Sequence, residues 1–138
     1  MTDAAPDGEA PSTPWSPPLP PGEAIELPGR GTTFVRTMPG PRDAPTVLLL
    51  HGWTATMDIN WFRCFEPLGR HFRVIAVDMP GLGDSADAAR DITLDAYLSR
   101  MTDALDQVIG RDAELSLVGF SVGGLMATAI ATRLGRRV

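Results

Sequence analysis

The chain has 138 residues, 43% of them hydrophobic, which is enough for one small domain with a core of its own. Its net charge is −5, and its arginines form no basic cluster interleaved with aromatic residues, so we expect neither a nucleic-acid partner nor membrane binding. One cysteine allows no intrachain disulfide, no run approaches the roughly 18 apolar residues of a membrane helix, and the start lacks a secretory signal pattern. Together these features predict a cytoplasmic protein.

The first 22 residues differ in composition from the rest of the chain. They contain seven of the 13 prolines together with small polar and acidic residues. Such a segment cannot bury enough apolar surface to order itself. We therefore predict a disordered Pro-rich leader over residues 1–22 and one folded domain over residues 23–138.

Strand and helix patterns alternate along the predicted domain. Residues 23–27 and 32–38 are expected to form a hairpin. Residues 46–51 are a continuous apolar run, which is typical of a strand covered on both faces of a parallel sheet. The later expected elements are helix 60–70, strand 72–78, a glycine-rich loop over 79–85, helix 91–109, strand 114–120 and helix 122–137. This order predicts an α/β fold, a mostly parallel sheet with helices on both faces.

The helix expected over residues 91–109 has the clearest pattern. Its apolar residues fall on one stripe, as in a helix that packs one face against a core. Thr93 is a candidate N-cap, because a threonine side chain can accept a hydrogen bond from the first turn. Gly110 is the candidate stop.

The stretch Gly119-Phe120-Ser121-Val122-Gly123 joins the last expected strand to the last expected helix. Gly-x-Ser-x-Gly in that setting is the pattern of a nucleophile elbow, a sharp turn that exposes the serine hydroxyl. The turn brings the helix close to the strand, so a β-carbon at Gly119 or Gly123 is expected to clash. The alternative is an ordinary strand-to-helix connection that happens to contain a serine.

A serine that attacks a carbonyl needs a base to remove its proton and donors for the oxyanion that forms. The backbone N–H of Val122, at the positive end of a helix, is the first candidate donor. The N–H of Trp53 is the second, because Gly52 lets the chain turn sharply after the buried strand over 46–51. These donors and Ser121 form the predicted site.

The chain has two histidines. His51 ends the first buried strand, and we expect it to hold the following loop by hydrogen bonds; a role as general base is the alternative. His71 lies between a helix and the start of a strand, so it is expected at the opposite edge of the sheet. Neither position favours a catalytic base for Ser121.

Residues 81–86, Gly-Leu-Gly-Asp-Ser-Ala, also match a Gly-x-Gly-x-x-Ala dinucleotide fingerprint after a strand. That fingerprint requires a helix that opens at the glycines, with its N-terminus on the pyrophosphate. Here the next helical pattern begins only near residue 92. We therefore interpret Asp84 and Ser85 as loop-shaping residues and predict no cofactor and no metal.

The order of these motifs resembles the α/β-hydrolase family. It runs from His51-Gly52-Trp53, through Asp-Met-Pro-Gly-Leu-Gly-Asp-Ser, to Gly-Phe-Ser-Val-Gly-Gly, and the resemblance covers roughly residues 23–138. It implies that Ser121 is the nucleophile and that Trp53 and Val122 are the oxyanion-hole donors. It also implies a serine hydrolase that acts on a small-molecule, ester-like carbonyl through an acyl-enzyme.

The sequence departs from the family pattern after Ser121. An acid and a histidine normally follow the nucleophile, whereas residues 122–138 contain no His, Asp or Glu. We therefore expect an incomplete core that corresponds to the N-terminal half of a family member and is inactive alone. Alternatives are a non-catalytic binding module or a half-enzyme completed by another chain. An unpaired strand edge at residues 114–120 would favour association.

Overall fold

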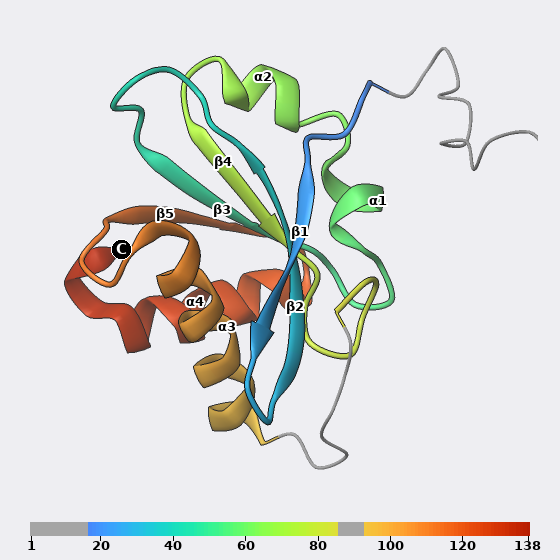
Figure 1. Cartoon of the computed structure of the whole chain (residues 1–138), viewed down its shortest axis with the longest axis vertical. Coiled ribbons are helices and arrows are strands. Elements are labelled where there is room, and N and C mark those ends of the chain that lie inside the picture. The colour runs from blue at the N-terminus through green and yellow to red at the C-terminus, as the bar shows by residue number, and fades with distance from the viewer. Residues whose placement is uncertain (1–16, 86–92) are drawn as a thin grey trace, which may run out of the picture.

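A mixed five-stranded sheet forms the centre of the protein (Figure 1). The computed structural model describes residues 17–85 and 93–138. The strands lie in the order β1-β2-β4-β3-β5, so the α/β fold is as expected. The elements are β1 (Gly22–Leu27), β2 (Gly31–Met38), β3 (Thr46–Leu50), α1 (Met57–Trp61), α2 (Phe65–Gly69), β4 (Arg73–Val77), α3 (Leu94–Ile109), β5 (Leu115–Gly119), α4 (Val122–Leu134) and a short 3₁₀ turn, η1 (Gly135–Arg137).

Strand direction divides the sheet into two parts. β1 and β2 form the expected hairpin, and β2 pairs antiparallel with β4. β3 lies between β4 and β5 and is parallel to both. The register places Leu50 opposite Val77 on one side and Gly119 on the other, so the loops that follow these three strands leave the same edge of the sheet.

Both faces of the sheet are covered by helices (Figure 1). Successive side chains of a strand point to opposite faces. In β3, Leu48 and Leu50 pack in the core cluster that includes α3 and α4, whereas Val47 and Leu49 pack in the cluster that includes α1 and α2. A strand buried on both sides needs apolar residues at every position, which accounts for the continuous apolar run.

The helix expected over residues 60–70 is instead two short helices, α1 and α2. Pro67 explains the break, because a proline clashes with the carbonyl four residues earlier, here that of Arg63, and cannot donate to it. The chain makes a tight turn there, with Cys64 N–H bonded to the Trp61 carbonyl at 2.7 Å. The first helix also begins earlier than expected, since Thr56 caps it through Ile59 N–H.

The ends of α3 and α4 follow local capping chemistry. Thr93 Oγ1 accepts from Ala96 N–H at 3.2 Å, and Gly110 ends α3 at φ 90°. α4 stops at Leu134, earlier than expected, because Gly135 adopts φ 58°. Residues 1–16 of the predicted leader over residues 1–22, and the expected helix start at Asp91, lie outside the described residues. In the described part of the chain, no helix is both long and apolar enough to cross a membrane.

Candidate active site

The elbow turn between β5 and α4 has an unusual backbone. Ser121 adopts φ 54° and ψ −120°, a conformation that L-residues rarely hold. Its side chain is exposed and makes no capping bond to the helix. Gly123 N–H donates to the Phe120 carbonyl at 2.9 Å, and Gly124 N–H donates to the Ser121 carbonyl at 2.8 Å, which closes the turn. The serine hydroxyl is therefore held outward at the start of a helix.

Two glycines allow this turn. A β-carbon on Gly119 would lie under 3.0 Å from the backbone of Gly123, and one on Gly123 would lie under 3.0 Å from the carbonyl oxygens of Leu50 and His51. Real β-carbons do not approach backbone atoms that closely. Helix α4 therefore starts in direct backbone contact with the end of β3.

The loop after β3 lies beside the same turn. Phe120 N–H donates to the Leu50 carbonyl at 3.0 Å, and a β-carbon on Gly52 would meet the Phe120 ring at 2.9 Å. Gly52 N–H is held by Asn60 Oδ1 at 2.7 Å. The structure thus brings Gly52 and Trp53 next to the elbow that carries Ser121 and Val122.

The two expected oxyanion donors remain available. Within residues 17–85 and 93–138, no protein group accepts a hydrogen bond from the backbone N–H of Trp53 or of Val122. Val122 is the first residue of α4, where backbone N–H groups have no partner inside the helix. Both N–H groups are therefore free to meet a ligand oxygen.

His51 is fully buried and both ring nitrogens are engaged. Met79 N–H donates to Nε2 at 2.9 Å, so Nε2 carries no proton. Nδ1 then carries the proton and donates it to the Gly52 carbonyl at 2.8 Å. A neutral histidine fixed in this way ties the end of β3 to the end of β4 and has no nitrogen left for Ser121. His71 is exposed just before β4, away from the loop ends.

Asp78 is a buried carboxylate whose role sequence reasoning missed. Its Oδ1 accepts from Met57 N–H at 2.8 Å and its Oδ2 accepts from Asp84 N–H at 2.9 Å. The Ser85 hydroxyl donates to the Asp78 carbonyl. A β-carbon on Gly83 would collide with the same carboxylate. Asp78 therefore holds α1 and the glycine-rich loop together. In the sequence, an Asp at the end of a strand followed by glycines is the feature that could have indicated this role.

The glycine-rich loop does not open a helix at its glycines. Residues from Pro80 to Ser85 form turns, and Gly83 is required by the Asp78 carboxylate rather than by a phosphate. The glycines therefore do not provide the helix N-terminus that a dinucleotide site requires. Among residues 17–85 and 93–138, no group of three or more His, Cys, Asp or Glu side chains lies close enough to hold a metal ion.

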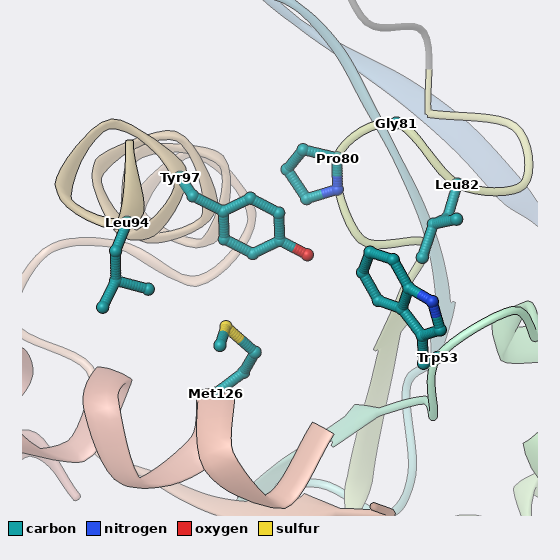
Figure 2. A pocket seen from close by; sticks show the side chains of 7 residues that line it. All are labelled: Trp53, Pro80, Gly81, Leu82, Leu94, Tyr97 and Met126. Atoms are coloured by element: carbon teal, nitrogen blue, oxygen red, sulfur yellow. The ribbon is translucent and has the colours of Figure 1, made fainter. Parts of the chain in front are cut away.

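A cavity of about 400 Å³ lies beside the loop ends (Figure 2). Trp53, from the loop after β3, forms one wall, and Met126 of α4 forms part of the floor. Its lining residues come from two loops and two helices: Trp53, Pro80, Gly81, Leu82, Leu94, Tyr97 and Met126. Burial raises the pKa of Tyr97 above its ordinary value, and the Arg100 charge only partly offsets this. The Tyr97 phenol is therefore neutral.

Comparison with known proteins agrees with this arrangement. Residues 45–138 match the family model described as alpha/beta hydrolase fold. Pimeloyl-[acyl-carrier protein] methyl ester esterase of Nitrosomonas europaea is 36% identical over 70% of this chain and 35% of its own length. The 2-hydroxy-6-oxo-6-(2'-aminophenyl)hexa-2,4-dienoic acid hydrolase of Metapseudomonas resinovorans is 33% identical over 62% of this chain and 30% of its own.

Solved structures have the same fold. Naproxen esterase from Bacillus subtilis superposes with a TM-score of 0.76 at 27% identity, covering 88% of this chain and 41% of that one. The chain thus spans about a third of the length of the curated relatives and about two fifths of this esterase. The family model covers β3, β4, β5, the elbow and the loop ends described above. The chain belongs to the alpha/beta hydrolase family.

Proposed function

We propose that this chain provides the nucleophile and the oxyanion donors of an ester hydrolase. The observation that carries the proposal is the backbone of Ser121, which is held at φ 54° in a turn that two glycines allow. Strained residues of this kind cluster at working sites. The esterases among the relatives support an ester-like carbonyl as the substrate class.

In the proposed reaction, Ser121 Oγ attacks the carbonyl carbon and loses its proton to a base. The carbonyl oxygen becomes an oxyanion that accepts from the N–H groups of Val122 and Trp53. Collapse expels the alcohol and leaves an acyl-enzyme, which water then hydrolyses. Removal of one such donor typically costs about 10²–10³ in turnover, so the two N–H groups are a large part of the proposed catalysis.

The base and its acid are not among the groups around Ser121. Both nitrogens of His51 are bonded to backbone, His71 lies away from the loop ends, and residues 122–138 contain no His, Asp or Glu. We propose that a further polypeptide segment supplies them. Loss of the histidine from a serine triad costs about 10⁶-fold, so the chain by itself is expected to be inactive. The lone cysteine fits a cytoplasmic setting for this activity.

Labelling with a fluorophosphonate tests the assignment. The purified chain is treated alone and after mixing with the C-terminal half of an alpha/beta hydrolase, which supplies an acid and a histidine. We expect covalent labelling only in the mixture, its loss in Ser121→Ala, and its retention in Ser116→Ala, a matched exposed serine on β5. Labelling that survives in Ser121→Ala would contradict the proposal. Labelling of Ser121 in the isolated chain would show that it has its own base.

A non-catalytic binding module is the second candidate. The engagement of His51 by Met79 and Gly52 favours it, because the family site is then present without a base. In that case the cavity beside Trp53 would bind a ligand without turnover. Absence of labelling both alone and in the mixture, together with measurable ligand binding, would favour this function.

A further inference from the structure

The cavity beside the elbow has the composition of a small-molecule pocket. Its volume of about 400 Å³ falls within the usual range for such sites, about 300–1,000 Å³. No lining residue carries a charged side chain. An ionised ligand would lose its hydration there without a compensating partner, so the lining favours a neutral ligand.

One polar side-chain group points into this apolar space. Figure 2 shows the Tyr97 hydroxyl directed between Pro80 and Trp53, with Met126 nearby. The six-membered ring of the Trp53 indole, rather than its nitrogen, faces that hydroxyl. No described residue forms a hydrogen bond with the Tyr97 hydroxyl. A neutral phenol without a hydrogen-bond partner is a donor with an unused proton.

The cavity and the proposed reaction site share one residue, Trp53. Trp53 contributes its side chain to the cavity wall and its backbone N–H to the proposed oxyanion hole. Met126 lies four residues after Val122, and residues four apart share one face of a helix. A ligand in the cavity would therefore lie beside the proposed reaction site.

We propose that this cavity binds the neutral alkyl or aryl part of an ester-like substrate and that Tyr97 donates a hydrogen bond to an acceptor atom on it. The acceptor, a ketone, ether or second ester oxygen, is separate from the carbonyl under attack. Tyr97 is thus a specificity-determining residue. The identity of the ligand as a substrate rests on the proposed function, whereas the binding itself does not.

A pair of isosteric probes tests the role of Tyr97. 2-Acetylnaphthalene and 2-isopropenylnaphthalene have nearly the same shape, but only the ketone offers an acceptor. Equilibrium dialysis with the full chain measures both affinities. We expect the ketone to bind about three- to tenfold more tightly, the range expected for one net hydrogen bond. Tyr97→Phe removes that preference and leaves the affinity for the alkene unchanged.

Two further variants separate the possible outcomes. Thr128→Val removes a hydroxyl from an exposed position of α4 that does not line the cavity, so the preference for the ketone is expected to persist. Leu94→Trp fills the cavity from the exposed first turn of α3 and is expected to weaken both probes. Equal binding of the probes by the wild type, or a preference that survives in Tyr97→Phe, would overturn the role of Tyr97. Absence of binding by either probe would overturn the cavity as a ligand site.

The same probes keep this inference separate from the proposed hydrolase reaction. Ser121→Ala removes the proposed nucleophile but none of the cavity lining. We expect the ketone preference to be unchanged in this variant. If fluorophosphonate labelling fails while the ketone is still preferred over the alkene, the hydrolase function is rejected and the binding site is kept. If labelling succeeds while the ketone is not preferred, the proposed role of the binding site alone is rejected.

Discussion

Tyr97 is a titratable side chain whose pKa is displaced by its place in the fold. Its phenol lies half-buried on α3, and burial raises its pKa. It is also the only tyrosine, and the chain has no lysine. No other side chain here is of a type that ordinarily titrates near pH 10. Formation of phenolate in the folded protein, followed by its absorbance, therefore reports on this one residue.

This environment predicts a loss of stability at alkaline pH. The folded protein keeps the phenolic proton to higher pH than the unfolded chain does, so the stabilising difference is complete below pH 10. As pH rises from 10 through the folded pKa, the unfolded state is favoured progressively. We expect the urea midpoint of the wild type to fall over this interval and that of Tyr97→Phe to fall less. Parallel curves for the two proteins would contradict the assignment.

At the scale of elements, the contact between α4 and β3 depends on Gly123. Its backbone lies against the carbonyls of Leu50 and His51, with no room for a β-carbon. The adjacent Gly124 has room, since its added β-carbon would meet nothing closer than 3.6 Å. These neighbouring glycines of one helix therefore make a matched pair.

Substitution by alanine should have different effects on stability at the two glycines. Gly123→Ala is expected to destabilise the fold by about 1–3 kcal/mol or more, because strand and helix must separate. Gly124→Ala is expected to be neutral or to stabilise by up to ~1 kcal/mol, the helix propensity difference. Urea denaturation with both midpoint and slope measures the change. A similar loss in both variants would show that the contact at Gly123 is not the cause.

Most elements were predictable because their signals are local. The apolar run of β3 and the Thr93 cap depend on neighbouring residues, and both are present in the structure. The break between α1 and α2 followed from Pro67, a local signal that the expected continuous helix over residues 60–70 did not take into account. The end of α4 at Gly135 depended on a left-handed backbone that sequence spacing does not reveal.

The surroundings of the site were only partly predictable. Motif order placed Ser121, Val122 and Trp53 at the same edge of a parallel sheet, since parallel strands present their ends together. The hydrogen bonds of Asp78 to residues as distant in sequence as Met57 could not be read from local pattern. Nor could the direction of the Tyr97 hydroxyl, because it depends on how α3 packs beside a loop from β4.

For the molecule as a whole, the outer edge of β5 is an open edge of the sheet, with no strand paired to it in the described residues. In the described part of the chain β5 pairs only with β3. Val118 is aligned with Leu49 on the face that α1 and α2 cover, yet it is 42% exposed, because those helices pack against β3 and β4. Phe120 beside it is 58% exposed. An open strand with apolar side chains is a surface for strand pairing.

We predict that the isolated chain self-associates through this edge. Sedimentation over a range of concentrations should show a mass that rises with concentration. Val118→Lys is expected to reduce this association, because a charge on the open strand opposes pairing. Ile59→Lys is the control, since Ile59 is an equally apolar exposed residue on α1. Equal effects of the two substitutions, or a monomer at every concentration, would rule out this edge as the interface.

The backbone of Ser121 has a consequence for what selection acts on at this position. A non-glycine residue held in such a conformation costs on the order of 1–3 kcal/mol, and glycine would fit the same turn with less strain. Folding alone therefore favours glycine at position 121, and the side chain present there reduces the stability of its own domain. Serine at this position therefore lowers the stability of the turn relative to glycine and places a hydroxyl group on it. Such a loss of stability is expected where a side chain serves chemistry rather than the fold.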